Sequence, residues 1–213
     1  MFKKAMFLLM FVIFMAVGCD QVINTKIELD TLESFNPESG MIFVPGRLAF
    51  EVPSEKEFNK TRHFLEVTLN DYFMNVRNVK HVKENFDDIV LVDVDIPLTF
   101  KRVDDMPTPF YFTYNDKTLY INLSGVALTR LNDDLKKALN QGINRLVDIR
   151  VNAYVVNTTH YPVTLTTPSL FIDNTSVNDN TTIELDSGES TTITCSNVMV
   201  DLSSKQSVKI FSF

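Results

Sequence analysis

The sequence predicts an α+β protein, and three observations lead to this prediction. Residues 58–73 and 128–146 each carry apolar side chains at spacings of three and four, the period of an amphipathic helix. Most other segments are rich in Val, Ile, Thr and aromatic residues, as strands are. After residue 147 helix-forming residues become rare. We expect an N-terminal part with two amphipathic helices against an antiparallel sheet, followed by a C-terminal part like a β-sandwich.

Residues 1–18 are interpreted as a signal peptide. Lys3 and Lys4 form a positive start, and the apolar run of residues 5–17 matches a signal-peptide core but is short for a membrane span. The quartet Ala16-Val17-Gly18-Cys19 resembles a lipobox, the site where bacterial lipoproteins are acylated and cut. Cys19 is then the acyl acceptor. The alternatives are an ordinary signal peptide and a short N-terminal anchor helix in which the cysteine occurs by chance.

Asp20 and Gln21 follow this cysteine and are the candidate sorting signal. In enteric-type bacteria, an Asp directly after the lipidated cysteine resembles the signal for retention in the inner membrane. We therefore expect the protein on the periplasmic face of the inner membrane, with the outer membrane as the alternative. In the simpler interpretation, Asp20 is only the first polar residue of a flexible tether.

The charge of the chain excludes some partners. The whole sequence has a net charge of −7, and removal of residues 1–18 takes away two lysines and no acid, which leaves −9. Such an acidic body disfavours binding to nucleic acid and broad contact with anionic lipid headgroups. The membrane is therefore expected to be a partner only through the lipid on Cys19.

Residues 19–40 are expected to form a lipid-anchored tether and a first short element. Ile27, Leu29 and Leu32 are spaced for a strand or a short turn, and residues 36–40 form a loop because they contain Pro and Gly. An α+β domain is then expected over residues 41–147. Its first segment, residues 41–52, is predicted to be extended, with Pro45-Gly46 as a turn or bulge inside it.

The first helix is predicted to start at Ser54, whose hydroxyl can cap the amide of Glu57. Its apolar stripe consists of Phe58, Leu65, Leu69, Tyr72 and Phe73, with the stem of Arg62 at its edge. We expect this helix to cover a sheet. A membrane-surface helix is the alternative, but the segment is too acidic to bind anionic lipid well.

Residues 75–123 are predicted to be β-structure. Val76, Val79 and Val82 indicate a weak strand, residues 89–96 a stronger one, and residues 110–114 and 118–123 a hairpin. A second helix follows. Its apolar positions are Leu128, Leu131, Leu135, Ala138, Leu139, Ile143 and Leu146.

The C-terminal segment is predicted to be all-β. Five strands are expected over residues 148–156, 162–172, 181–185, 191–199 and 208–213, with turn residues between them. Short strands at this spacing are typical of a small β-sandwich. We therefore place a domain boundary near residue 148 and expect a sandwich-like domain over residues 148–213.

Few residues point to chemistry. Once Cys19 is acylated, Cys195 has no partner for an intramolecular disulfide, and we interpret it as a small buried hydrophobe. His63, His81 and His160 are scattered, so no metal site is expected. Residues 173–180 are rich in oxygen ligands but lack the glycine and glutamate of a calcium loop, which favours a hairpin turn.

Asp93 and Asp95 lie on one face of a predicted strand. This spacing allows binding of a divalent cation or acid–base work, but a solvated strand face is the favoured interpretation. The sequence contains neither a G-x-S-x-G motif nor a phosphate-binding loop. We therefore expect no catalytic residue and no cofactor.

Three segments resemble a family of small lipoproteins of unknown function that tailed phages and prophages carry. They are Thr25-Lys26-Ile27-Glu28-Leu29, Gly46-Arg47-Leu48-Ala49-Phe50-Glu51-Val52 and Val94-Asp95-Ile96-Pro97-Leu98. The resemblance covers most of the mature chain. It implies a lipid-anchored envelope protein and gives no catalytic residue.

The C-terminal part resembles immunoglobulin-like sandwiches of the late-embryogenesis-abundant type. The resemblance rests on Val156-Asn157-Thr158-Thr159-His160-Tyr161-Pro162-Val163, Ser169-Leu170-Phe171-Ile172-Asp173 and Leu185-Asp186-Ser187-Gly188-Glu189-Ser190. In those domains an Asn followed by a Pro shapes a turn between two strands. The resemblance implies a fold and not a function.

These observations favour a non-enzymatic envelope lipoprotein that acts by binding, with an envelope or phage protein as its partner. The phage resemblance implies modification of the host surface or exclusion of a second infection. One alternative is a periplasmic carrier of lipids or other apolar ligands, in which the 17 Phe residues line a tunnel. The other alternative is an envelope hydrolase.

Overall fold

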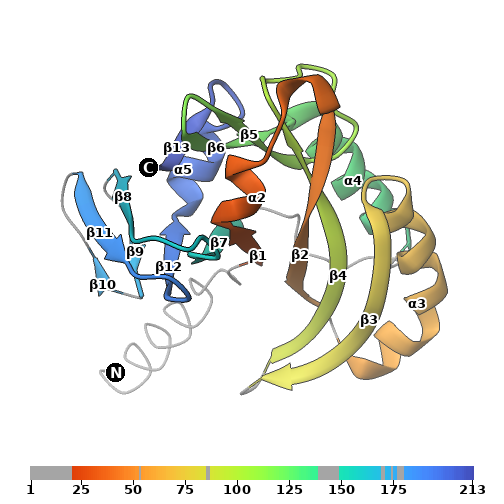
Figure 1. Cartoon of the computed structure of the whole chain (residues 1–213). Helices are drawn as coiled ribbons and strands as arrows, with labels where there is room; N and C mark the ends of the chain where they lie inside the picture. Colours follow the sequence, from red (N-terminus) through yellow and green to blue (C-terminus); the bar gives the residue numbers. More distant parts are fainter. Residues whose placement is uncertain are drawn as a thin grey trace, which may run out of the picture.

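The fold is shown in Figure 1 as a computed structural model that describes residues 21–52, 54–84, 87–138, 149–168, 171–173, 175–176 and 180–213. Its N-terminal elements are β1 (Gln21–Glu28), α2 (Leu29–Glu33), the 3-10 turn η1 (Pro37–Ser39), β2 (Met41–Glu51), α3 (Glu55–Asn70), β3 (Met74–Glu84), β4 (Asp87–Thr99), β5 (Phe110–Asn115), β6 (Thr118–Leu123) and α4 (Gly125–Ala138). The C-terminal elements are β7 (Ile149–Val156), β8 (Val163–Thr167), β9 (Phe171–Ile172), β10 (Thr175–Ser176), β11 (Thr181–Leu185), β12 (Ser190–Cys195), α5 (Asn197–Leu202) and β13 (Val208–Ser212).

The described strands form one large curled sheet. Their order is β10-β9-β12-β7-β1-β2-β4-β5-β6-β13-β8-β11, and β3 pairs with β4 beside this path. The fold is predominantly β with a few helices, and is therefore broadly α+β, as predicted. The expected antiparallel sheet is in fact mixed, because β1 pairs with β7 and β4 pairs with β5 in parallel.

The segment expected to be a tether is, from Gln21 onward, the central strand β1. β1 pairs with β7 along all eight of its residues and with β2 on its other side. Ile23 and Ile27 alternate toward the core, and Ile27 is fully buried. Leu29 and Leu32 are buried on α2, so the short element expected around them is present. The expectation of a tether is therefore wrong from Gln21 onward, because the apolar residues of this segment are buried in the core.

β2 runs straight through Pro45-Gly46, where a turn or bulge was expected. Its register with β4 is regular from Met41 opposite Thr99 to Glu51 opposite Ile89. Glycine is needed at position 46 because a Cβ there would lie 2.4 Å from Cδ1 of Ile96. The pairing of β1 with β2 ends at Gly46, next to Pro45, which has no N–H to donate to a ladder.

The edge strand β3 carries two bulges. Its register with β4 shifts between Met74 and Arg77 and again between Arg77 and Lys80. Asn75 and Asn78 have positive φ angles of 52° and 54°, a conformation that asparagine tolerates better than most residues. The bulges explain why the valines of this strand recur every three residues and not every two.

Helices α3 and α4 pack on each other and lie beside β3 and β4 (Figure 1). Ser54 caps α3 as predicted, and its Oγ accepts a hydrogen bond of 3.2 Å from the amide of Glu57. The expected core positions Phe58, Leu65, Leu69, Leu131 and Leu135 are all buried. Leu139 and the expected end of the second helix lie outside the described residues. Of the described helices, none is both long and apolar enough to cross a membrane.

The hairpin of β5 and β6 forms as predicted. Asp116 and Lys117 occupy its turn with positive φ angles of 46° and 57°. Two such residues are the signature of a type I′ turn, whose twist matches that of the flanking strands. β5 also extends the sheet from β4, which places the hairpin between β4 and β13 in the strand order.

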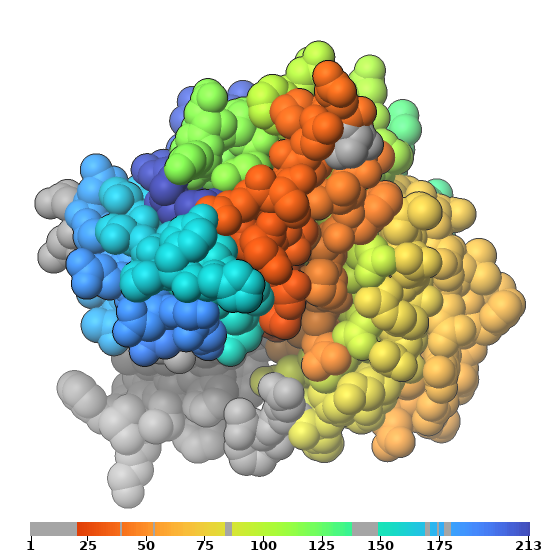
Figure 2. Space-filling view, in the orientation of Figure 1, coloured from red at the N-terminus to blue at the C-terminus, as the bar shows by residue number. Residues whose placement is uncertain are grey.

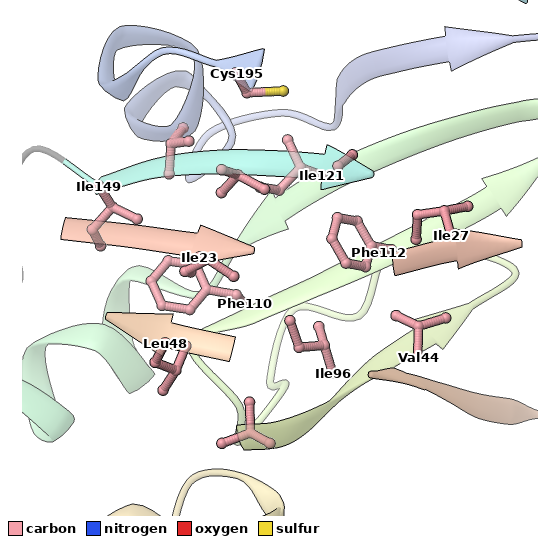
Figure 3. Close-up of a cluster of buried hydrophobic side chains, with 14 of the residues drawn as sticks. Ile23, Ile27, Val44, Leu48, Ile96, Phe110, Phe112, Ile121, Ile149 and Cys195 are labelled. Atoms are coloured by element: carbon pink, nitrogen blue, oxygen red, sulfur yellow. The ribbon is translucent and has the colours of Figure 1, made fainter. Parts of the chain in front are cut away.

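The C-terminal strands do not form a sheet of their own. β12 and β7 join the sheet at β1, whereas β13 joins it at β6, so these strands enter the strand order on both sides of the N-terminal ones. Ile149 and Cys195 belong to the same buried cluster as Ile23, Phe112 and Ile121 (Figure 3). The composition changes at residue 148, but the sheet and the core continue across it.

One C-terminal element differs in type from the prediction. Residues 197–199 were expected to continue a strand, but α5 begins at Asn197 and lies against β7. β12 ends at Cys195, opposite Val151 of β7. Val198 is the most exposed large apolar residue of the described part, which shows that the apolar pattern of residues 197–200 is not that of a buried strand.

Candidate functional site: a polar groove on the outer face of the sheet

The face of β12, β7, β1, β2, β4 and β3 that points away from the core carries a continuous row of polar residues, which we call the polar row. Strand pairing places its members directly opposite one another. They are Thr194 of β12, Asn152 of β7, Asn24 of β1, Arg47 of β2, Asp93 of β4 and Arg77 of β3. Directly opposite side chains on one face are close enough to interact.

Hydrogen bonds connect neighbouring members of the polar row. The hydroxyl of Thr194 donates to Oδ1 of Asn152 over 2.9 Å. Nδ2 of Asn152 donates to Oδ1 of Asn24 over 3.0 Å. Further along, Nε of Arg47 donates to Oδ1 of Asp93 over 2.6 Å. Hydrogen bonds therefore fix Thr194, Asn152 and Asn24 as one group and Arg47 and Asp93 as another.

The middle of the row forms the floor of a groove, which we call the sheet groove. The groove has a volume of about 330 Å³ and is lined by Asn24, Thr25, Lys26, Pro45, Gly46, Arg47, Arg77, Asp93 and Tyr154. Figure 2 shows it as the hollow between the surface of β1 and β2 and that of β3, with β4 at its floor. Its size is at the lower end of ligand sites in proteins, which span about 300–1,000 Å³.

Each cation that lines the groove is paired with a carboxylate. Lys26 lies 2.5 Å from Glu28, Arg47 lies 2.6 Å from Asp93, and Arg77 lies 2.9 Å from Asp95. The hydrogen bond from Arg47 lowers the pKa of Asp93 below its ordinary value, and Asn78 and the charge of Arg77 act in the same direction. Asp93 therefore stays ionised, and the charges of the groove compensate one another.

The bulges of β3 bring two amides to the same carboxylates. Nδ2 of Asn75 donates to Asp95 over 2.5 Å, and Nδ2 of Asn78 donates to Asp93 over 2.8 Å. In a regular strand, residues 75 and 78 would point to opposite faces. Bulges are frequent beside functional sites because they re-aim side chains in this way. Both carboxylates are thus held in a fixed orientation.

Of the residues that the sequence singled out, Asp93 lines this groove. Cys19 and Asp20 are outside the described residues. Gln21 is the first residue of β1 and is buried, so it is part of the fold and not of a free segment. Asp93 and Asp95 do share a face, as predicted, but they are held by arginines and asparagines and are not simply solvated.

The sequence did not single out Asn24, Arg47 and Arg77 as site residues. The available signal was the alternation of polar and apolar residues along the segments of β1 and β2. That alternation gives the face on which each residue lies, but it does not give the register between strands. The polar row exists only because five pairings align one polar residue from each strand.

Other candidate residues have structural surroundings. Cys195 is fully buried, which raises the pKa of its thiol to about 12 and agrees with its interpretation as a small hydrophobe. Nε2 of His81 lies 2.6 Å from Oδ1 of Asp88, whereas His63 and His160 are exposed. Among the described residues, no group of three or more His, Cys, Asp and Glu side chains could hold a metal ion.

Three comparisons with known proteins bear on these findings. The comparisons with curated proteins and with solved structures gave no match. A family model, described as a domain of unknown function (DUF7424), matches residues 21–213. The match starts at the first residue of β1 and spans the sheet on both sides of residue 148. The chain therefore belongs to the DUF7424 family.

Proposed function

We propose that the protein is a lipid-anchored bacterial envelope protein that acts by binding, with the sheet groove as its binding surface. The polar row is the observation that supports this proposal most. Its side chains are held in place by hydrogen bonds to one another or to neighbouring residues, which is how a binding site is organised before its ligand arrives. The lipobox-like quartet before Asp20 supports the anchor.

The position of β1 constrains how such an anchor would act. A single residue, Asp20, separates Cys19 from Gln21, so their Cα atoms are at most about 7 Å apart. A lipid on Cys19 would therefore hold the folded body at the headgroups and not on a long tether. Asn24 lies three residues further along β1, which places the groove floor within about 17 Å of the acylated residue.

Labelling with a clickable fatty acid tests the anchor. We expect wild-type protein to be labelled and recovered with membranes. Cys19→Ser should remain unlabelled and uncleaved, whereas Cys195→Ser should be labelled like wild type because its thiol is buried. Labelling of the Cys19→Ser variant would contradict the proposal.

We further propose residence on the periplasmic face of the inner membrane, with Asp20-Gln21 as the sorting signal. Because Gln21 belongs to β1, Asp20 is the position that can be tested without disturbing the fold. Wild-type protein should sediment with the inner membrane on a density gradient, and Asp20→Ser should move to the outer membrane. Sedimentation of both with the outer membrane would refute the signal.

A phage or prophage origin and a relation of residues 148–213 to late-embryogenesis-abundant sandwiches remain part of the proposal. Asn157 supports the second point, since its side chain organises the turn between β7 and β8. Expression in a susceptible host followed by phage plating tests exclusion of a second infection. Unchanged plating across a broad phage panel would contradict that role.

The two alternative functions receive less support. An apolar cavity lined by Phe50, Phe73 and Phe110 lies between the sheet and the helices, but its volume of about 20 Å³ suits a single water and not an acyl chain. For an envelope hydrolase, Asp93 is poorly suited to the role of general acid, because the hydrogen bond from Arg47 lowers its pKa. Binding is therefore the function that we propose.

A further inference from the structure

We propose that the sheet groove binds an uncharged, hydroxyl-rich saccharide. The inference rests on the proposed binding function and names its ligand class. Three properties of the groove lead to it, namely its charge balance, its unused hydrogen-bonding groups and its open, polar shape.

The charge balance favours a neutral ligand. Lys26, Arg47 and Arg77 are each paired with a carboxylate at 2.9 Å or less. A phosphate or another anion would have to compete with these carboxylates, and a cation would have to compete with the two arginines and the lysine. An uncharged ligand can bind without breaking any of the three ion pairs.

The unused hydrogen-bonding groups favour hydroxyls. Arg47 uses Nε for Asp93, and within the described residues neither of its Nη groups donates a hydrogen bond. Asn24 uses its Oδ1 as an acceptor, and its Nδ2 donates to no described residue. Donors therefore lie beside the carboxylate oxygens of Asp93 on the groove floor. A hydroxyl both donates and accepts, so adjacent hydroxyls of a sugar ring match such mixed sets.

The shape of the groove suits a chain of rings that lies across the strands. The groove is open to solvent and extends from Tyr154 on β7 to Arg77 on β3. The ring of Tyr154 is about half exposed, and its hydroxyl is held 2.8 Å from Oγ of Ser190. A fixed, exposed aromatic ring offers an apolar surface on which the C–H face of a sugar can stack.

Titration calorimetry with the full-length acylated protein tests the proposal. The protein is reconstituted in phospholipid nanodiscs prepared without glycoside detergents, which would occupy a saccharide site. The probes are uncharged oligosaccharides of glucose, mannose, galactose and N-acetylglucosamine, together with inorganic phosphate and an uncharged decapeptide pool of Gly, Ser, Thr and Asn. We expect one saccharide series to bind, with an affinity that changes less than twofold between 50 and 500 mM NaCl.

Variants locate the binding in the groove. Arg47→Lys keeps a positive charge beside Asp93 but loses the Nη fork, and Asn24→Ala removes one amide. Each should weaken saccharide binding about tenfold, the effect of 1.4 kcal/mol, and Tyr154→Ala should also weaken it. Thr164→Ala and Tyr161→Ala alter exposed residues outside the groove and should bind like wild type. Unchanged melting temperatures exclude unfolding as the cause.

Four results would overturn the proposal. Two concern the ligand, namely binding of phosphate or of the peptide pool in place of saccharides, and no saccharide binding at all. The third is a saccharide affinity that falls steeply with salt. The fourth is equal saccharide binding by the groove variants and the control variants. Failure of fatty-acid labelling would instead refute the anchor, so the two failures are distinguishable.

Discussion

At the residue scale, Asn157 shows how one buried amide holds two loops together. Its Nδ2 donates to the carbonyl oxygens of Tyr161 and Leu185, each over 2.9 Å. Its Oδ1 accepts from the amide and the hydroxyl of Thr159, over 3.0 and 2.6 Å. The side chain is fully buried, so water cannot replace it as the partner of the Leu185 carbonyl and the Thr159 amide, whereas the carbonyl of Tyr161 also accepts from the hydroxyl of Thr159.

Asn157→Ala should lower the free energy of unfolding by about 2–4 kcal/mol, because it leaves buried carbonyl and amide groups without this partner. Urea unfolding followed by circular dichroism measures the change. Asn180→Ala, at an exposed position, is the matched control and should change the free energy of unfolding by less than about 0.5 kcal/mol. Equal effects of the two substitutions would contradict the role of Asn157.

Gly46 is required by one neighbouring side chain. A Cβ at this position would lie 2.4 Å from Cδ1 and 2.8 Å from Cγ1 of Ile96. Gly46→Ala should therefore destabilise the protein by about 1–3 kcal/mol. Ile96→Val removes Cδ1, so the double variant should be more stable than the sum of the single effects predicts. Additive effects in such a double-mutant cycle would show that the clash is not the cause.

The ion pair of Arg47 and Asp93 predicts a dependence of stability on pH. Arg47 lowers the pKa of Asp93 below the ordinary value of 3.8. The ionised Asp93 therefore stabilises the fold above about pH 4, and this contribution is lost as the pH falls through the lowered pKa. Arg47→Gln should be less stable than wild type at pH 6, and the difference should narrow toward pH 2.

Urea unfolding of both proteins between pH 2 and pH 6 measures this difference. Lys205→Gln removes an exposed cation far from the groove and controls for net charge. A gap between wild type and Arg47→Gln that stays constant with pH, or that is matched by Lys205→Gln, would refute the assignment.

At the element scale, β3 combines an edge of the sheet with one wall of the sheet groove. An exposed edge strand invites pairing with other chains, and bulges are one way to prevent it. The bulges at Asn75 and Asn78 also direct their amides to Asp95 and Asp93. The same local geometry therefore interrupts the edge and completes the groove.

Substitutions at Asn78 separate its two roles. Asn78→Gly keeps the positive φ of 54° accessible but loses the hydrogen bond to Asp93, whereas Asn78→Ala loses both. The alanine variant should be less stable than the glycine variant by about 1–2 kcal/mol, the cost of a left-handed residue with a side chain. The reverse order in thermal or urea unfolding would show that the strand is not bulged at Asn78.

Local signals in the sequence predicted the elements well. The cap at Ser54 gave the start of α3, and the apolar stripes gave the buried residues of α3 and the described part of α4. The turn residues of the β5–β6 hairpin gave its position. The valines of β3 indicated a strand. Their spacing of three residues, however, does not show at which residues the strand is bulged. Local signals did not show that a strand begins at Gln21, because its partner strand β7 lies far along the chain.

At the scale of the whole molecule, long-range pairing produces both the fold and the groove. β1 joins β7, which starts 121 residues beyond the end of β1, and β13 joins the sheet at β6. Sequence alternation assigns each residue to a face but does not fix such registers. The sequence therefore predicted a separate C-terminal sheet that the strand order does not contain, and it did not reveal the groove residues Asn24, Arg47 and Arg77, because both depend on which strands pair.

The proposed anchor lies close to the groove along the chain. β1 carries Gln21 at one end and Asn24 and Lys26 on the groove floor, without a flexible segment between them. A lipid on Cys19 would therefore hold the groove within about 17 Å of the acylated residue. Any ligand of the groove would then be bound close to the membrane surface.

Mass spectrometry of the N-terminal peptide of the membrane-extracted protein is the most direct test of the proposed lipid anchor. We expect a mature chain that starts at Cys19, with a diacylglyceryl group on its sulfur and Asp20-Gln21 immediately following. A peptide in which Val17-Gly18-Cys19 is intact, or a mature chain whose Cys19 carries a free thiol, would contradict it.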